Sequence, residues 1–175
     1  QISTAGTEAS GTGNMKFALN GALTIGTWDG ANIEMAQAIG EQQLFVFGLR
    51  TEQVAQLKAL GVDPRLYAEE NLALREVLDA IGGGAFSHHE RDRYRGLVHQ
   101  LLHRDPYLLL ADFASYVQAQ QAVDALYAQP AAWAERSGLL DDGPLDDVDD
   151  LVVGECGDGV GDGQALDDGH LHDEA

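Results

Sequence analysis

The chain has 175 residues and carries 29 Asp and Glu against 10 Lys and Arg, a formal net charge of -19 at pH 7. This length suits about one domain with a substantial core. A surface of that sign repels phosphate backbones and anionic lipid headgroups, which argues against nucleic-acid binding and against membrane-surface binding. The single cysteine, Cys156, suits a reducing compartment, so we expect a cytoplasmic protein. Because the sequence starts without Met or a signal-like segment, we expect it to be a fragment.

The first sixty residues predict an α/β arrangement. A loop rich in Gly, Ser, Thr and Asn leads into a first helical turn near residue 13, and the segments that follow are a strand at 22–25, a helix at 31–39, a strand at 44–47 and a helix at 51–60. Asp29 is expected near the N-cap of the second helix, and Gly40 and Gly61 end the later two helices. The apolar runs are continuous and not alternating, which favours parallel strands covered on both faces.

The chain then becomes helical. Asp63 and Pro64 predict an N-cap followed by Pro at the first helical position, and Ser87 with Glu90 predicts a capping box. Apolar residues recur at helical spacing in three stripes that we expect to be core: Leu74, Val77, Leu78 and Ile81; Tyr94, Leu97, Val98, Leu101 and Leu102; and, within 111–127, Phe113, Tyr116, Val123, Leu126 and Tyr127.

Residues 138–175 differ in texture from everything before them. They hold 13 of the 29 acidic residues and eight glycines, with no Lys, Arg or aromatic residue. Such a segment buries little and carries much charge, so we expect a disordered acidic tail after a folded part at 1–137.

The segment from Gly6 to Phe17 is the most informative for chemistry. Its glycines and small residues allow consecutive backbone N–H groups to converge, and a helix beginning near residue 13 adds its positive end, which together predict an anion cradle. The P-loop pattern fails because Thr12 stands where Lys should, and the dinucleotide pattern fails because Lys16 takes the position of the third glycine. Both kinds of nucleotide binding are therefore disfavoured.

Lys16 has two interpretations. A positive charge just inside a helix opposes the helix dipole, so the lysine either points into solvent or is neutralised as an imine with a carbonyl cofactor whose phosphate occupies the cradle. The residues alone favour the first interpretation, because single lysines in loops are common.

The whole run from Glu8 to Asn20, EASGTGNMKFALN, resembles the pyridoxal-phosphate attachment motif of the α-glucan (glycogen, starch and maltodextrin) phosphorylases. The resemblance continues through GALTIGTWDGANIEM at 21–35, FVFG at 45–48, DPY at 105–107 and ADF at 111–113, and it stops near residue 137. It implies that residues 1–137 are the last part of the Rossmann-like C-terminal domain of a GT-B glycosyltransferase. This full-length parent enzyme would cleave α-1,4-glucan with inorganic phosphate and would be a homodimer.

The resemblance also implies roles for individual residues. Lys16 would be the catalytic residue that forms the imine with pyridoxal 5'-phosphate, and the backbone of Gly11, Thr12 and Gly13, with the Thr12 hydroxyl, would hold the cofactor phosphate. The glucosyl unit would contact Glu8 through its carboxylate and Ala9, Ser10 and Gly11 through backbone N–H groups. The basic residues that bind substrate phosphate in this family would precede Gln1, so the isolated fragment is expected to be inactive.

The resemblance bears on the tail as well. Phosphorylases continue after the counterpart of Trp133 with basic, aromatic-containing helical sequence, whereas this chain continues with residues that share G- or C-rich codons. We therefore expect 138–175 to be a translated shift of reading frame or a misjoined terminus, against the alternative of a genuine acidic tail.

The remaining candidates are weaker. The pair His99 and His103 could share a metal ion but lacks a third ligand nearby, so we expect a surface or packed pair; His170 and His172 are ascribed to tail composition, and Trp28 and Trp133 to packing. No metal site is predicted. Two rivals to the phosphorylase hypothesis remain: a non-enzymatic acidic helical interaction module, and a pyridoxal-phosphate enzyme of another fold, which the order of elements after Lys16 disfavours.

Overall fold

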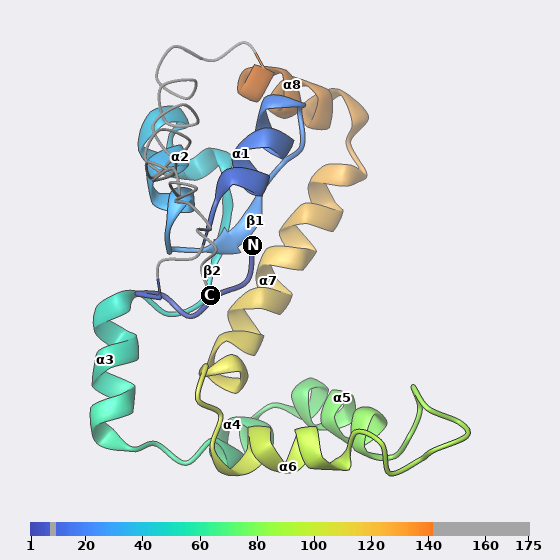
Figure 1. The fold of residues 1–175 in the computed structure, drawn as a ribbon. Helices are drawn as coiled ribbons and strands as arrows, with labels where there is room; N and C mark the ends of the chain where they lie inside the picture. The colour runs from blue at the N-terminus through green and yellow to red at the C-terminus, as the bar shows by residue number, and fades with distance from the viewer. Residues whose placement is uncertain (8–9, 142–175) are drawn as a thin grey trace, which may run out of the picture.

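A computed structural model describes residues 1–7 and 10–141, apart from the side chains of 139–141. The elements in chain order are α1 (Thr12–Leu19), β1 (Ile25–Thr27), α2 (Ala31–Ile39), the short 3-10 helix η1 (Glu41–Gln43), β2 (Phe45–Phe47), α3 (Thr51–Leu60), α4 (Arg65–Glu70), α5 (Leu72–Gly82), α6 (Arg95–His103), α7 (Leu109–Tyr127) and α8 (Pro130–Asp141). Figure 1 shows a sheet region with α1 and α2 at one end of the molecule, a helical region at the other, and α7 running between them.

The two strands are short and parallel, with Ile25 opposite Phe45 and Thr27 opposite Phe47. The predicted order of helices and strands and the parallel pairing are therefore confirmed for this region. The first strand begins three residues later than the apolar run predicts. Gly21 adopts φ +77° and the Ala22 N–H donates to Phe17 O at 2.9 Å, so the start of that run completes the end of α1.

The core of the sheet region lies between α1, α2 and the start of β2. Met15 and Ala18 of α1 pack with Met35 and Ala36 of α2 and with Leu44, while Trp28, Ile39 and Val46 cover the edge of this cluster. α7 packs against β2, where the rings of Phe47 and Tyr116 meet edge to face with centroids 5.1 Å apart. Helix α1 therefore packs against α2, the crossover between the strands, and α7 packs against the second strand, β2.

The helical region has a separate core of Ala68, Leu74, Leu78 and Leu110, against which Tyr67, Val98, Leu101, Leu102 and Phe113 pack. The three predicted stripes supply most of these residues. Three stripe members are exposed: Val77 by 43%, Leu97 by 49% and Tyr127 by 71%. The prediction is wrong for these three residues because α5, α6 and the end of α7 lie at the periphery of the fold. Neighbouring helices cover only part of each apolar stripe there.

Helix ends differ from the expectations in three places, one of which is α4, where Pro64 and not Asp63 is the N-cap. Gly30, at φ 51°, is the N-cap of α2, and the Asp29 carboxylate turns to the preceding loop. The predicted capping box of Ser87 and Glu90 does not begin a helix, because turns occupy that segment and α6 begins at Arg95. The Asp63 carboxylate does accept the Arg65 N–H at 3.0 Å at the start of α4.

The last described helix, α8, extends through residues 138–141, which the sequence assigned to the tail. The predicted boundary at Gly138 is therefore four residues too early. Residues 142–175, where the rest of the predicted disordered tail lies, are outside the described residues. Within the described part of the chain, no helix combines the length and apolar character needed to cross a membrane.

Candidate functional site

The candidate site is built on the loop that runs from the edge of β1 to the start of α1. The loop begins beside the strand, where the Gln1 amine donates to Ile25 O at 2.9 Å and the Thr27 N–H donates to Gln1 O at 3.2 Å. It therefore leaves the sheet at the carboxyl end of β1. Ligand sites of open α/β sheets form at that end of the strands.

A buried carboxylate holds the first half of this loop. Asp29 is 3% exposed; its Oδ1 accepts the Gly6 N–H at 2.8 Å, and its Oδ2 accepts the Ser3 hydroxyl at 3.0 Å. The Thr7 hydroxyl lies 3.2 Å from Oδ2 and 2.6 Å from Thr4 O. Asp29 thus ties residues 3–7 to the start of α2.

Close packing against α2 holds the second half of the loop. Gly11 is buried, and a Cβ added there would lie 1.9 Å from the Ala31 Cβ, so only glycine permits this approach. One turn further on, Asn14 Nδ2 donates to Asn32 Oδ1 at 2.8 Å, and the buried Asn32 donates to Thr27 O at 2.9 Å. These contacts fix α1 relative to both α2 and β1.

The N-terminus of α1 fits an anion. Its N-cap is Gly11, which provides no side-chain cap, and its first turn contains no acidic residue to compensate the positive end of the helix. Gly13 is exposed, and an added Cβ would meet no atom within 4 Å among the described residues. Backbone N–H groups in such a glycine-containing first turn are accessible to a phosphate, so these residues fit the phosphate end of the implied cofactor.

Lys16 is exposed on α1, three residues after Gly13 and therefore on the same face of the helix. Side chains of an α-helix incline toward its N-terminus, so the Lys16 side chain leads back toward the first turn. Gly11, Thr12 and Gly13 therefore lie at the start of α1 and Lys16 lies in its last turn, so the expected opposition between the lysine charge and the helix dipole is absent. Ser10 is exposed and its carbonyl accepts the Gln1 Nε2 at 3.2 Å, whereas Glu8 and Ala9 lie outside the described residues.

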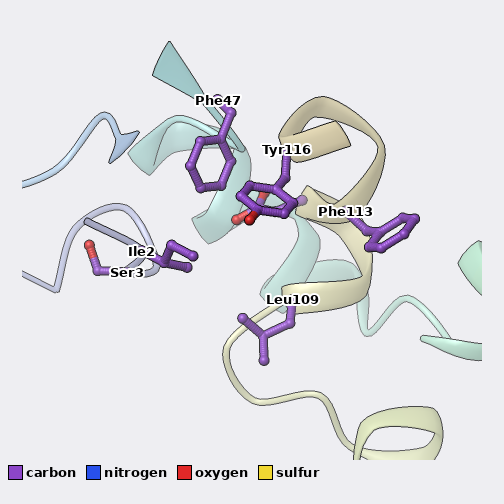
Figure 2. Close-up of a pocket in the computed structure, with 7 residues that line it drawn as sticks. Ile2, Ser3, Phe47, Leu109, Phe113 and Tyr116 are labelled. Atoms are coloured by element: carbon purple, nitrogen blue, oxygen red, sulfur yellow. The ribbon is translucent and has the colours of Figure 1, made fainter. Parts of the chain in front are cut away.

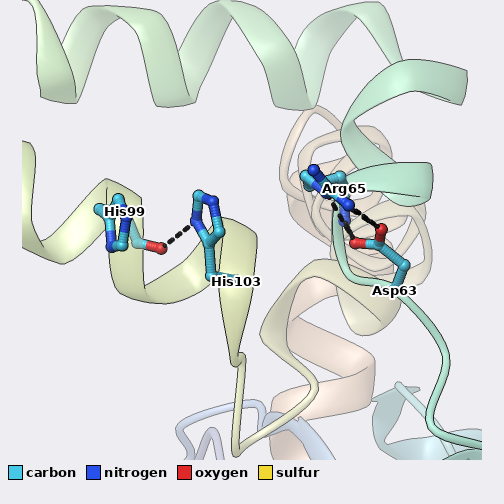
Figure 3. Close-up of polar contacts among 4 residues, drawn as sticks. All are labelled: Asp63, Arg65, His99 and His103. Carbon is cyan, nitrogen blue, oxygen red and sulfur yellow. Dashed lines mark hydrogen bonds and ion pairs between the residues drawn. The ribbon is translucent and has the colours of Figure 1, made fainter.

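The two histidines of α6 do not form a chelating pair. The rings of His99 and His103 stack with centroids 4.0 Å apart and planes 15° apart, and His103 Nδ1 lies 2.8 Å from His99 O (Figure 3). Residues 1–7 and 10–141 contain no cluster of three metal-ligating side chains. Beside them, the side-chain and backbone hydrogen bonds from Arg65 lower the pKa of the exposed Asp63 to about 2.

Both tryptophans pack, as expected. The Arg50 guanidinium covers the Trp28 ring at 4.1 Å, and the Trp133 ring meets Tyr127 edge to face at 5.2 Å. His170 and His172 lie outside the described residues.

A concavity of about 160 Å³ lies between the loop and α7 (Figure 2). Its lining is mostly apolar: Ile2, Ser3, Phe47, Leu109, Asp112, Phe113 and Tyr116. Burial raises the pKa of Asp112, and the 2.8 Å hydrogen bond that its carboxylate accepts from the Leu49 N–H partly opposes that rise. This carboxylate joins α7 to the segment that follows β2.

Asp29 and Asn32, which hold the site loop and α1, were not predicted from the sequence to have these roles. The available signal was a pair of polar residues directly after a buried strand, in Asp29-Gly30-Ala31-Asn32, but helix-capping rules gave Asp29 a different role. Because buried polar side chains require partners, their neighbours in the fold had to be known before their function could be.

Together these features define an α/β segment with a glycine N-cap at the start of α1 and an exposed lysine one turn along that helix. The family model for carbohydrate phosphorylases matches residues 1–140, and the chain belongs to that family. It is 51% identical over 138 residues to a glycogen phosphorylase of Chlamydia pneumoniae and 51% identical over 136 residues to the brain form of Homo sapiens. Over 133 residues it is 50% identical to the muscle form of Ovis aries.

These alignments cover 76–78% of this chain but only 16–17% of the relatives' length. The chain therefore spans about a sixth of the proteins that it matches. The resemblance predicted from the run at residues 8–20 is confirmed at the level of the family. The family match ends at residue 140, so it includes only the first three residues of the segment 138–175.

Proposed function

We propose that this chain carries the cofactor-anchoring segment of an α-1,4-glucan phosphorylase, a glycosyltransferase that releases glucose 1-phosphate from glucan ends with inorganic phosphate. The observation that carries the proposal is the position of Lys16 one turn after the glycine-containing start of α1, in a chain of the carbohydrate phosphorylase family. The interaction-module alternative has no specific observation in its favour.

The residues of α1 would hold pyridoxal 5'-phosphate. Backbone N–H groups at Gly11, Thr12 and Gly13, with the Thr12 hydroxyl, would bind the phosphate, and the Lys16 amine would attach to the carbonyl carbon. When bound, the cofactor supplies a phosphate that relays a proton to inorganic phosphate. Lys16 therefore anchors the group, and the positive end of α1 offsets its negative charge.

The loop before α1 would bind the glucosyl unit. Glu8 would accept hydrogen bonds from sugar hydroxyls, and the backbone N–H groups of Ala9, Ser10 and Gly11 would donate to the sugar. A short loop that carries both contact sets holds sugar and cofactor side by side, which is how positioning accelerates a reaction between two bound groups.

The rest of the proposal concerns the longer protein. The β1–α2–β2 unit with parallel strands supports assignment to a Rossmann-like domain, and we propose that it belongs to the C-terminal domain of a GT-B enzyme. We further propose a cytoplasmic homodimer. Because residues that bind substrate phosphate would lie outside these 175, the isolated chain is expected to be inactive.

Borohydride reduction of the full-length protein, followed by peptide mapping, tests the assignment of Lys16. We expect the pyridoxyl group on Lys16 and none on Lys58, the other lysine of this sequence, which is exposed on α3. Lys16→Arg keeps the charge but cannot form the imine, so phosphorolysis should fall by orders of magnitude, while the matched Lys58→Arg keeps full activity. A label on Lys58, or on no lysine, refutes the assignment.

A further inference from the structure

Residues at the start of α2 hold the loop of the candidate site in place. Asp29 holds residues 3–7, Ala31 receives Gly11 in close packing, and Asn32 binds Asn14 of α1. The segment between Thr7 and Gly11, which includes the proposed glucosyl contacts, is therefore attached at both ends to four consecutive residues. This attachment is not evident from the sequence, because Asp29, Ala31 and Asn32 follow the loop by about twenty residues in the chain.

Asp29 is the part of this support that requires a specific chemical group. A carboxylate offers acceptors on both oxygens, and Asp29 uses one for the Gly6 N–H and the other for the Ser3 hydroxyl. Its burial at 3% exposure next to the first turn of α2 places a negative charge at the positive end of that helix. An apolar residue would remove the acceptor of the Gly6 N–H and one of the two partners of the Ser3 hydroxyl, which also lies 3.1 Å from the Thr27 hydroxyl.

We propose that Asp29 is a positioning residue for the glucosyl and cofactor loop. Its carboxylate fixes residues 3–7, which precede the proposed glucosyl contacts and the start of α1. This inference rests on the proposed function, because the loop matters for catalysis only if it carries those contacts. A displacement of about 1 Å in such a loop can lower a rate about 100-fold.

The test compares two buried aspartates in the full-length protein. Asp29→Ala removes the acceptors that hold the site loop. The control Asp112→Ala removes another buried carboxylate, which lines a concavity with Ile2 and Ser3 but whose hydrogen bond is to the Leu49 N–H and not to the loop. We expect kcat to fall about 10- to 100-fold in Asp29→Ala and to stay within about twofold of wild type in Asp112→Ala. Equal losses in both variants, or no loss in Asp29→Ala, overturn the proposal.

Asp29→Asn covers the case in which Asp29→Ala does not fold. The amide keeps an acceptor for the Gly6 N–H but presents a donor in place of the second oxygen, so kcat should fall about threefold to tenfold. Wild-type kcat in this variant overturns the requirement for a carboxylate.

Hydrogen exchange provides a readout that does not depend on turnover. Peptides covering residues 1–15 should exchange at least several-fold faster in Asp29→Ala than in wild type, and should be unchanged in Asp112→Ala. If these peptides exchange faster in Asp29→Ala, while the wild-type protein neither phosphorolyses glucan nor labels on Lys16, the proposed function is refuted and the structural link is retained. Unchanged exchange refutes the positioning role even if the enzyme is active.

Discussion

The sheet region and the helical region are stabilised in different ways. Around β1 and α2, buried polar side chains connect the elements: Thr4, Thr27, Asp29 and Asn32 are each at most 5% exposed, and each bonds across chain segments. In the helical region the buried cluster is aliphatic, and the buried Asp105 accepts the Leu109 and Leu110 N–H groups at 2.9 and 2.8 Å to cap α7.

This difference indicates where function resides. Burying a polar group is unfavourable unless its partners are fixed, so a polar network specifies one arrangement of its elements. Aliphatic packing stabilises a region and tolerates small adjustments more readily. The loop of the proposed site is attached to the polar region, and such an attachment favours one placement of the loop.

The largest effect on stability is expected in the helical core. Leu78 is 5% exposed and packs against Leu74 and Leu110, so Leu78→Ala should lower the free energy of unfolding by about 2–5 kcal/mol. The control Val77→Ala, at a neighbouring position of α5 that is 43% exposed, should cost less than about 1 kcal/mol.

Urea unfolding measures both substitutions, and hydrogen exchange locates their effects. Amides of α5 and α6 should lose protection in Leu78→Ala while those of α1 and α2 keep most of theirs. Equal loss of protection in both regions would show that they form one cooperative core.

A smaller effect is expected where the loop packs against α2. Gly11→Ala places a methyl group 1.9 Å from the Ala31 Cβ, so the loop or the helix must move, at a cost of about 1–3 kcal/mol. Gly13→Ala meets no described atom within 4 Å and should raise helix stability by about 0.5–1 kcal/mol.

The two glycine variants separate stability from ligand contact. Both should bind less cofactor in the full-length protein, as measured by borohydride labelling of Lys16, although only Gly11→Ala is less stable. Full labelling of Gly13→Ala would show that no phosphate approaches the backbone closely at that position.

Local sequence signals predicted much of the fold. The helices at 31–39 and 51–60 have the predicted bounds because Gly40 and Gly61 end them, the latter at φ 65°. The bounds of the strands were less accurate, because a three-residue strand is defined by its partner and not by its own apolar run. The exposure of Val77 and Leu97 depends on how many helices surround α5 and α6, which spacing does not encode.

The site was predictable only in part. The run at residues 8–20 identified the family, and Gly11 lies at the start of α1, where the sequence predicted a helix start, with Lys16 one turn further on. The supports at Asp29 and Asn32 were not predicted, because each bonds to a segment well separated in the chain. Long-range polar contacts of this kind depend on the tertiary fold, whereas capping rules consider only neighbours.

The smallest expected effect concerns the joint between the two regions, where α7 leaves the helical core and reaches β2. Asp112 accepts the Leu49 N–H there, and its pKa is raised mainly by burial and further by the nearby negative charge of Asp105. An acid whose pKa is higher in the folded protein than in the unfolded chain binds more protons when folded. Its contribution to stability is therefore present at low pH and is lost as pH rises from about 4 through the raised pKa.

Asp112→Asn should remove this penalty while its amide oxygen still accepts the Leu49 N–H. We expect the variant to unfold at a slightly higher temperature than wild type at pH 7, with the difference shrinking toward pH 4, in thermal scans across that range. Asp63→Asn provides the contrast, because the pKa of Asp63 is lowered to about 2 and its ionisation therefore favours the folded state throughout the same range. A loss of stability in Asp112→Asn at pH 7 would show that the charge of the carboxylate, and not only its acceptor oxygen, holds α7 to the sheet.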